Sequence, residues 1–435
     1  MFSLRPPEQT RKLFHLAWPL LLSNCTVPLL GLVDTSVLGH LPDERYLAAV
    51  ALGAVIFSFL YWGFGFLRMG TTGLVAQAWG KKDRQGLGRL LLQALSLALL
   101  LGLALQLLRP FLSELLGLLE GSPTTQPLAE DYVAIRLWSA PAALVQYVIL
   151  GVAIGLGRTR IVLLLLVTGN GINILLDLWF VLGLGWTSAG VAWASLLAEV
   201  TTASLGLAWL LKTCRQLQIP LKGLHPEPKA LKKLLVVNAD LFVRTLALLL
   251  ALAFFTRQGA SQGDSYLAAN AVLMQLVMLS SYLLDGFAQA VEGRFGKAYA
   301  RSFDEARSIY HAGRWLSVMT AVLITFLAWL GGPWLIDQLT SLVEVRELAK
   351  TYLPWLWLLL PVSLWCYLYD GVFIGATWTA AMRNSLLLAL SGFLLAWWLL
   401  KGYGNHGLWA AFLLFNGLRG LILGWIFQRK FSVIN

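Results

Sequence analysis

The chain has 435 residues, of which 58% are hydrophobic and 13% carry a charged side chain. An ordinary soluble domain carries about 25% charged residues, so this composition excludes that class of protein. The net charge of +11 raises the question of a nucleic-acid partner. We expect none, because the basic residues follow the pattern of a membrane topology, as shown below.

Twelve mostly apolar stretches are long enough to cross a bilayer as α-helices, which takes about 20 residues each. Their continuous apolar character disagrees with transmembrane strands, in which polar and apolar residues alternate over about ten residues. We therefore predict an all-α integral membrane protein that is surrounded by the lipid bilayer. The predicted spans lie near residues 14–38, 47–78, 88–108, 130–156, 160–184, 188–211, 234–256, 266–291, 312–336, 352–375, 381–400 and 406–427.

The two halves of the chain repeat each other. Gly151-Val152-Ala153-Ile154-Gly155 recurs as Gly371-Val372-Phe373-Ile374-Gly375, and Tyr46-Leu47-Ala48-Ala49 recurs at the same offset as Tyr266-Leu267-Ala268-Ala269. Gly80-Lys81 and Gly190-Val191 have counterparts in Gly296-Lys297 and Gly407-Leu408, at nearly the same offset. This pattern predicts two pseudo-symmetric six-helix bundles. Repeats whose interface holds a site are typical of transporters that work by alternating access.

The predicted domains are an N-terminal lobe at 1–212, a linker at 213–233 and a C-terminal lobe at 234–435. Three prolines in the linker disfavour its continuation as a buried helix. Under this topology 23 of the 33 Lys and Arg residues lie on the side of the linker and 6 lie on the opposite side. The positive-inside rule therefore predicts that both termini and the linker are cytoplasmic. We expect the first apolar stretch to be a span and not a cleaved signal peptide, because it lacks a small-residue cleavage site.

In the first span, Asp34 follows two prolines. An ionisable group in mid-membrane costs between about 2.5 kcal/mol and several times that amount, so it normally faces protein or water and has a function. Pro19 and Pro28 remove backbone donors and permit the helix to bend. We predict that Asp34 binds a coupling cation and that its protonation changes this bend. The alternatives are a carboxylate at the outer helix end and two static kinks.

The fifth span carries Asn170, Asn173 and Asp177 on one face, at i, i+3 and i+7. Ser195 of the sixth span is placed to face this stripe. Two carboxylates that converge on an amide repel each other, so that one of them takes up a proton near physiological pH. We predict a site for a proton or a small cation at Asp34, Asn173, Asp177 and Ser195. The alternative is interhelical hydrogen bonding without transport function.

Other ionisable residues within the spans are candidates for substrate binding or for a supporting polar network. Arg68 requires either a partner such as Asp34 or access to the cytoplasmic interface. Asp240 and Arg244 are spaced i, i+4 and are predicted to pair on one helix. The remaining candidates are Asp285 and Glu292, which lie two helical turns apart, and Asp370, which precedes the repeated glycine motif. For these residues structural ion pairing is the competing interpretation, and Glu292 has a further alternative position at the cytoplasmic end beside Arg294.

The chain shows none of the motifs of a membrane-embedded enzyme. Its three cysteines have no metal-binding spacing, its five histidines form no HExxH motif, and no paired aspartate motif for Mg²⁺ and pyrophosphate is present. We therefore predict no enzymatic activity, no disulfide, no metal site of that kind and no cofactor.

Several of these segments resemble the MATE (multidrug and toxic compound extrusion) transporters. Pro19, Gly31-Leu32-Val33-Asp34-Thr35 and Gly39-His40-Leu41 are similar to the first helix of that family. The segments closer to its DinF subfamily are Arg68-Met69-Gly70-Thr71-Thr72-Gly73, Asp285-Gly286-Phe287-Ala288 with Glu292, Trp365-Cys366-Tyr367-Leu368-Tyr369-Asp370-Gly371, Gly375-Ala376-Thr377 and Met382-Arg383-Asn384-Ser385. The similarity runs over essentially the whole chain.

The resemblance implies twelve helices in two bundles and a cleft that opens alternately to either side. It also implies expulsion of amphipathic, often cationic compounds in exchange for protons or Na⁺. By matching motif, Asp34 is the cation-binding aspartate of the first helix. Asn173 and Asp177 match the Asn-x-x-x-Asp of the fifth helix, and Ser195 stands where the family usually has threonine. Another MATE branch has a Na⁺ site in its second half that uses a carboxylate of the tenth helix. We do not expect that type of site in this chain, because the matching stretch Pro361-Val362-Ser363-Leu364 has no carboxylate.

We therefore predict a monomeric, proton-coupled multidrug antiporter of the bacterial cytoplasmic membrane. Sodium coupling is the first alternative, because the same four oxygen-bearing side chains suit Na⁺. A flippase for lipid-linked precursors, which has a related architecture, is the second. A flippase of that kind would require a cationic cavity for pyrophosphate, whereas the arginines within the spans here have acidic residues to match them.

Overall fold

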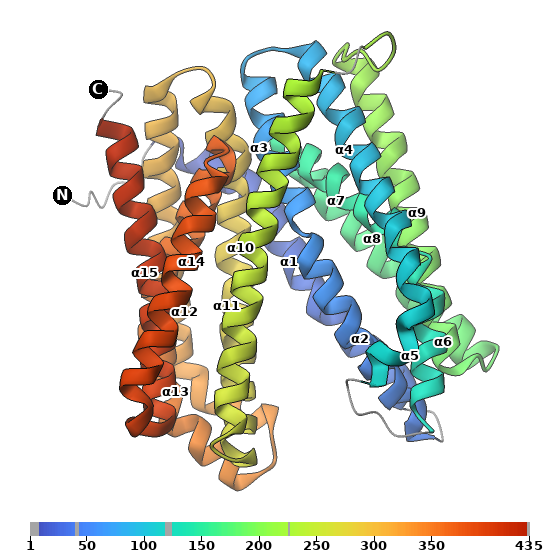
Figure 1. Cartoon of the computed structure of the whole chain (residues 1–435), viewed down its shortest axis with the longest axis vertical. Helices are drawn as coiled ribbons and strands as arrows, with labels where there is room; N and C mark the ends of the chain where they lie inside the picture. Colours follow the sequence, from blue (N-terminus) through green and yellow to red (C-terminus); the bar gives the residue numbers. More distant parts are fainter. Residues whose placement is uncertain (1–7, 40–42, 118–123, 225–226, 433–435) are drawn as a thin grey trace. The chain divides into compact units, whose positions relative to one another are not determined.

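The computed structural model describes residues 8–39, 43–117, 124–224 and 227–432 (Figure 1). The first half contains the helices α1 (Thr10–Gly39), α2 (Glu44–Phe64), α3 (Phe66–Gly80), α4 (Arg84–Ala104), α5 (Leu112–Gly117), α6 (Gln126–Leu137), α7 (Ala140–Gly155), α8 (Thr159–Asp177) and α9 (Thr187–Gln216). The second half contains α10 (Pro228–Ala260), α11 (Asp264–Tyr299), α12 (Phe303–Leu339), α13 (Val343–Ala376), α14 (Thr379–Leu400) and α15 (Gly404–Ser432).

The helices account for the predicted spans. Within the described ranges, nine helical segments are long and apolar enough to cross a membrane, or ten when the bent pair α6 and α7 counts as one span. One of these segments, Thr379–Phe431, contains both α14 and α15, which are separated by the 3₁₀ turn Lys401–Tyr403. When the pair α6 and α7 counts as one span, α14 and α15 count separately, and the 30-residue helix α1 is added, the total equals the twelve spans predicted. The all-α membrane fold is therefore confirmed.

The contacts divide the chain into two compact units. One comprises Leu22–Leu235, and the other combines Met1–Leu21 with Val236–Asn435. The first turns of α1 therefore pack with the second half of the sequence, where the rings of Phe14 and Phe287 lie 6.4 Å apart. The predicted lobes at 1–212 and 234–435 differ from this grouping at α1. Their independence as domains stays a prediction.

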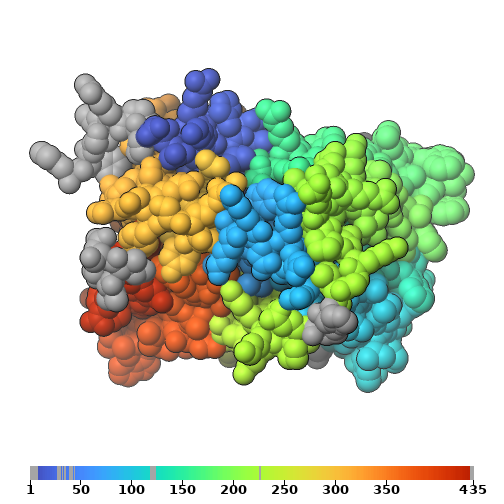
Figure 2. All heavy atoms as spheres, turned by 90° about the horizontal axis from the view of Figure 1, so that it is seen from above, coloured from blue at the N-terminus to red at the C-terminus, as the bar shows by residue number. Residues whose placement is uncertain are grey.

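The connection between the halves is shorter than the predicted linker at 213–233. Helix α9 continues to Gln216, and α10 already begins at Pro228, since proline is well suited to the first position of a helix. Within the unit Leu22–Leu235, the connection lies against the start of α4, as the adjacent light-blue and yellow-green surfaces in Figure 2 show. Arg84 Nη1 donates to Gln218 Oε1 at 2.8 Å, and Arg89 Nη1 lies 2.7 Å from Glu227 Oε2.

The repeated glycines of α7 bring that helix into backbone contact with α3. A Cβ atom added to Gly151 would lie 2.6 Å from the carbonyl oxygen of Arg68, and one added to Gly155 would lie 2.8 Å from that of Thr72. Both distances are shorter than any van der Waals contact. Only glycine therefore permits this approach of the two helices.

The same contact recurs in the second half, at the positions that the sequence repeat indicates. A Cβ atom on Gly371 of α13 would lie 2.5 Å from the carbonyl oxygen of Ala288 on α11, and one on Gly375 would lie 2.6 Å from that of Glu292. All four positions stand at one constant offset from their counterparts in the first half. The repeat read from the sequence is thus a repeat of helix packing.

The two halves differ in the continuity of these helices. In the first half the helix is interrupted at Gly65, between α2 and α3, and the pair α6 and α7 is bent by 51°. Helix α8 passes into the π-helical segment Leu178–Gly183 directly after Asp177. The counterparts of α2–α3 and α6–α7 in the second half are α11 and α13, which each run as one helix.

The close helix contact makes a prediction for stability. We expect Gly371→Ala to destabilise the protein by about 1–3 kcal/mol, because the added methyl group must displace the α11 backbone. Gly331→Ala in α12 is the matched control, because its Cβ meets no atom within 4 Å. In a helix it should be neutral or stabilise by up to about 1 kcal/mol. Thermal unfolding in detergent, followed by tryptophan fluorescence, measures both, and equal melting temperatures would contradict the packing argument.

Candidate functional site

A buried polar cluster joins α8 to α9. Asn173, Asp177 and Ser195 have exposed fractions of 3%, 0% and 5%. In the amide orientation that satisfies both of its polar atoms, Asn173 donates to Asp177 Oδ2 at 2.9 Å and accepts from Ser195 Oγ and N at 3.1 Å each. The predicted meeting of these three residues is therefore confirmed in geometry. Their role in ion coupling stays a prediction.

The predicted fourth member, Asp34, lies in α1, but its side chain falls outside the described part of the structure, as does that of Pro28. Pro19 is buried within the same helix. A contact between α8 and α1 is seen one turn before Asn173, where Asn170 Nδ2 donates to the Thr26 carbonyl at 3.3 Å. The predicted bending of α1 stays a prediction.

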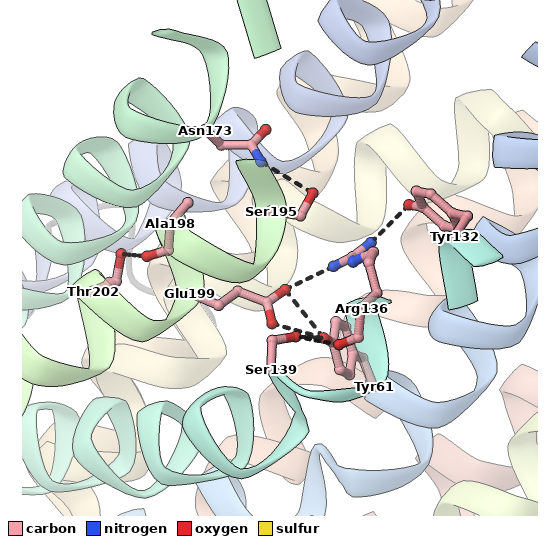
Figure 3. A network of polar contacts seen from close by, with 9 residues as sticks. All are labelled: Tyr61, Tyr132, Arg136, Ser139, Asn173, Ser195, Ala198, Glu199 and Thr202. Atoms are coloured by element: carbon pink, nitrogen blue, oxygen red, sulfur yellow. Dashed lines mark hydrogen bonds and ion pairs between the residues drawn. The ribbon is translucent and has the colours of Figure 1, made fainter. Parts of the chain in front are cut away.

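A second polar network lies one helical turn beyond Ser195 on α9 (Figure 3). Arg136 Nη2 of α6 lies 2.7 Å from Glu199 Oε1, and the Tyr61 hydroxyl of α2 donates to Glu199 Oε2 at 2.8 Å. The two charged side chains have exposed fractions of only 14% and 19%. An ion pair at this depth is screened little by solvent, so it fixes α2, α6 and α9 to one another.

Aromatic rings and hydroxyl groups complete this network. The Arg136 guanidinium lies 4.6 Å from the ring centre of Phe57, and its Nη1 donates to the Tyr132 hydroxyl at 3.1 Å. Ser139 Oγ donates to the Arg136 carbonyl at 2.7 Å and lies 3.4 Å from the Tyr61 hydroxyl. Sequence reasoning missed the network. The available signal was Glu199, an unexplained carboxylate on the same helix face as Ser195.

Asp370 is the centre of a buried ionic cluster in the second half, and the predicted pairing of Asp240 with Arg244 is wrong. Arg244 Nη2 of α10 pairs with Asp370 Oδ2 of α13, and Arg419 Nη2 of α15 lies 3.3 Å from the same oxygen. The exposed fractions of the three side chains are between 7% and 12%. Arg244 therefore pairs with a carboxylate on a neighbouring helix and not with Asp240, which lies one turn away on its own helix.

Asp240 instead joins α10 to α14. Arg383 Nη1 lies 2.5 Å from Asp240 Oδ1, and Thr379 Oγ1 donates to Asp240 Oδ2 at 2.9 Å. Arg383 lies near the start of α14. Its side chain is about one-third exposed, which agrees with a position at a helix end.

The remaining candidates are Asp285, Glu292 and Arg68. Gln289 Nε2 donates to Asp285 Oδ2 at 3.0 Å within α11. Glu292 is 2% exposed at the close contact of α11 with Gly375, and its predicted alternative position at the cytoplasmic end of the span beside Arg294 stays a prediction. Arg68 is half-buried in α3, where its carbonyl oxygen accepts from Thr72 Oγ1 at 2.9 Å.

At the positions equivalent to the Asn173 cluster, which lie within the described range 227–432, the second half carries aromatic residues. The repeat counterparts of Asn173 and Ser195 are Phe393 and Phe412, whose ring centres lie 6.1 Å apart. The same pair of helix positions therefore makes a hydrogen bond in one half and an aromatic contact in the other. Among the residues that the structure describes, no group of three His, Cys, Asp or Glu side chains is arranged to hold a metal ion.

The profile of a family described as MatE matches residues 19–179 and 242–398, one segment in each half of the chain. DNA damage-inducible protein F of Escherichia coli (strain K12) is 43% identical over 427 residues, which cover 96% of this chain and 92% of that protein. The chain belongs to the MATE family of membrane transporters. The likeness to DNA damage-inducible protein F also confirms the predicted DinF subfamily.

More distant relatives and solved structures agree with this family. Probable multidrug resistance protein NorM of Acinetobacter baylyi is 25% identical over 356 residues, which cover 78% of this chain and 77% of that protein. A structure described as the outward-facing conformation of a multidrug resistance MATE transporter matches with a TM-score of 0.90 at 22% identity. The match covers 99% of this chain and 97% of that structure. A MOP superfamily transporter from Pyrococcus furiosus, described as having a binding pocket of reverse polarity, also gives 0.90 at 21% identity, covering 98% and 96%. These two structures show the fold.

The ionic cluster around Asp370 makes a prediction for stability. We expect Asp370→Ala to cost about 3–5 kcal/mol, because two buried guanidinium groups lose their shared carboxylate. Combining it with Arg244→Met and Arg419→Met should restore part of this loss, because no uncompensated charge remains. Asp285→Ala, which removes the acceptor for the Gln289 amide, should cost about 1 kcal/mol. Unfolding free energies in detergent measure these differences, and equal costs for Asp370→Ala and Asp285→Ala would contradict the assignment.

Proposed function

We propose that this transporter expels amphipathic organic compounds, often cations, in exchange for protons by alternating access. Family membership makes it a multi-pass membrane transporter of the MATE multidrug type, and the proposal adds the coupling ion and the transport cycle. The proposed setting is the bacterial cytoplasmic membrane, with both termini in the cytoplasm, because the basic residues are concentrated on that side. The working unit is proposed to be a monomer.

The fully buried carboxylate of Asp177, held by Asn173 beside Ser195, is the observation that carries this proposal. A carboxylate in a low-dielectric interior is costly when ionised, so a second carboxylate nearby favours uptake of a proton. Asp34 is the proposed second carboxylate. Together they would bind a proton from one side of the membrane and release it to the other when the site changes its access.

The internal repeat supports placing Asp34 beside Asn173. At the offset that relates Gly151 to Gly371, the counterpart of Asp34 is Phe254 and the counterpart of Asn173 is Phe393. The rings of these two phenylalanines are in edge-to-face contact, with centres 5.4 Å apart. If α1 and α8 pack as their counterparts α10 and α14 do, Asp34 reaches the Asn173 cluster.

Sodium coupling is the competing assignment at the same site. Carboxylate, amide and hydroxyl oxygens are ligands that hard cations accept, and the four proposed side chains provide all three types. Protons are the proposed coupling ion because the Asp177 carboxylate is fully buried, and uptake of a proton avoids the free-energy cost of a buried charge. The two ions share the residues and differ only in the gradient that drives transport.

The substrate proposal depends on which charged side chains of the second half are already paired within the protein. Asp370 is engaged by two arginines, so it offers little negative charge to a cationic substrate, whereas Asp285 accepts a hydrogen bond from a neutral amide. Amphipathic compounds suit the abundant aromatic residues of the chain. A lipid-linked precursor flippase is less favoured, because Arg136, Arg244 and Arg419 are each paired with a carboxylate.

Movement of α1 is part of the proposal. Loss of the Asp34 charge on protonation would change the balance between a bent and a straighter helix at Pro19 and Pro28. Solved structures described as MATE in the bent conformation and in the straight conformation match this chain with TM-scores of 0.89 each. Both shapes are therefore compatible with the fold.

The decisive experiment replaces the proposed coupling carboxylate. In proteoliposomes with an imposed pH gradient, we expect wild-type protein to expel ethidium and Asp34→Asn to abolish this transport, because the amide takes up no proton. Asp177→Asn should have the same effect. Glu227→Gln, which breaks an exposed ion pair with Arg89, is the control and should retain full transport.

Two further results separate the alternatives. An imposed Na⁺ gradient without a pH difference drives efflux only if sodium is the coupling ion. Full pH-driven efflux by correctly inserted Asp34→Asn protein would refute coupling at this residue.

A further inference from the structure

We propose that Glu199 is a positioning residue of the transport cycle, which latches the half-helices α2 and α6 to α9. This inference rests on the proposed antiport function and adds to it a residue outside the coupling site. The observations that support it are an interruption of the helix at Gly65, a 51° bend between α6 and α7, and a largely buried carboxylate that contacts both places through Tyr61 and Arg136. A further observation is the different character of the equivalent positions in the second half of the chain.

The interruption at Gly65, within the span Arg45–Gly80, and the bend between α6 and α7 both lie next to the network around Glu199. Tyr61 lies in the last turn of α2, just before the interruption at Gly65, and Arg136 lies in the last turn of α6, directly before the 51° bend. Their side chains meet on Glu199. One carboxylate on α9 thus holds the ends of two half-helices.

Side chains also satisfy the backbone groups that these breaks release. At the first break, Gly65 N donates to the Trp62 carbonyl, and the Tyr61 carbonyl accepts from the Tyr147 hydroxyl at 3.2 Å. Unpaired carbonyls are costly in a membrane, so an interruption needs such donors. The break in α2–α3 is therefore stabilised by α7.

The second break follows the same logic. Pro141, near the start of α7, has no N–H group to donate to the Leu137 carbonyl, and Gln106 Nε2 donates to that oxygen at 2.7 Å. Ser139 donates to the Arg136 carbonyl with both its N and its Oγ, at 2.9 and 2.7 Å. Donors from other side chains thus stabilise both interruptions.

The equivalent positions of the second half, all of them within the described range 227–432, carry neither the latch nor the breaks. The repeat counterparts of Tyr61, Arg136 and Glu199 are Ser281, Leu356 and Asn416, none of which is charged. Their helices α11 and α13 are continuous at these positions. The Tyr147 contact is retained, since its counterpart Tyr367 donates to Ser281 Oγ at 2.5 Å. A contact that the fold requires in general would be present in both halves. The Arg136–Glu199 ion pair is present only in the half with interrupted helices, so we relate it to those interruptions.

The position of Glu199 connects the breaks to the coupling site. It follows Ser195 by one turn on α9, and Figure 3 shows the Asn173–Ser195 contact and the Glu199 network on neighbouring turns of that helix. A shift of α9 caused by a change at Asn173, Asp177 and Ser195 would therefore move Glu199 relative to Arg136 and Tyr61. Opening of the ion pair would free α2 and α6 to pivot on α3 and α7, which the close glycine contacts of α7 keep together.

The test combines kinetics with distances in the full-length protein. Glu199→Gln preserves shape but removes the charge, and we expect its kcat for ethidium efflux to fall by roughly tenfold with KM unchanged, because a conformational step and not binding is affected. Glu199→Asp keeps the carboxylate and should recover most of the rate. Tyr61→Phe removes only the hydroxyl and should give an intermediate loss, and it decides the matter if Glu199→Gln fails to insert.

Spin labels report the movement directly. With Cys25, Cys214 and Cys366 replaced, labels at the exposed positions Phe59 of α2 and Leu205 of α9 should show a broadened distance distribution in Glu199→Gln. Labels at Leu92 of α4 and Leu205 should show no change. Wild-type kcat in both Glu199→Gln and Tyr61→Phe, or an unchanged distribution between α2 and α9, would overturn the latch.

The failure of this proposal is distinguishable from failure of the antiport proposal. Ethidium exchange across the membrane without a pH gradient requires the conformational cycle but no net proton movement. Asp34→Asn should retain exchange, whereas Glu199→Gln should lose about as much exchange as efflux. If both variants retain exchange, the latch proposal is overturned, whereas the proposal of proton coupling at Asp34 is unaffected.

Discussion

The constraint on which this structure depends is that a charge within the membrane must have a partner. Removing two opposite charges from water costs several kcal/mol per ion, which only close pairing and additional hydrogen bonds recover. Arg136 meets this requirement on Glu199, and Arg244 and Arg419 meet it on Asp370. Each pair joins helices that are distant in sequence. The pairing of a small number of charges therefore determines which apolar helices are held in a defined arrangement.

The repeat preserves helix packing but not polarity. Glycines at equivalent positions of α7 and α13 make equivalent backbone contacts in the two halves, whereas the Asn173–Ser195 pair of one half is the Phe393–Phe412 pair of the other. Backbone contact demands a small residue at a fixed place, so it resists change. The residue type of a side chain in the middle of the bundle can differ between the halves, provided that the residue it contacts differs as well. At these equivalent positions the first half is polar and the second half is aromatic.

The length of the apolar stretches was sufficient to predict the twelve spans, and the recurring short motifs were sufficient to predict the repeat. Helical periodicity was sufficient to predict the shared face of Asn173 and Asp177, because that face depends only on spacing along the chain. It failed for Asp240 and Arg244. Their i, i+4 spacing permits a pair, but Arg383 and Asp370 on neighbouring helices provide better partners, and spacing contains no information on how those helices are rotated. Glu199 escaped prediction for the same reason, since its importance lies in two residues on helices far from it in the sequence.

Interrupted helices and polar side chains in the first half are consequences of each other. A break releases carbonyl groups that hydrocarbon cannot satisfy, so the surrounding positions must carry donors such as Tyr147, Ser139 and Gln106. The carboxylate of Asp177 in the same half is held separately, by Asn173. Helices α11 and α13 continue through the corresponding positions, although Pro354 and Pro361 within α13 also lack an N–H group to donate, and aromatic residues fill the corresponding space. The interrupted helices and the cluster of Asn173, Asp177 and Ser195 thus occur in the same half of the chain.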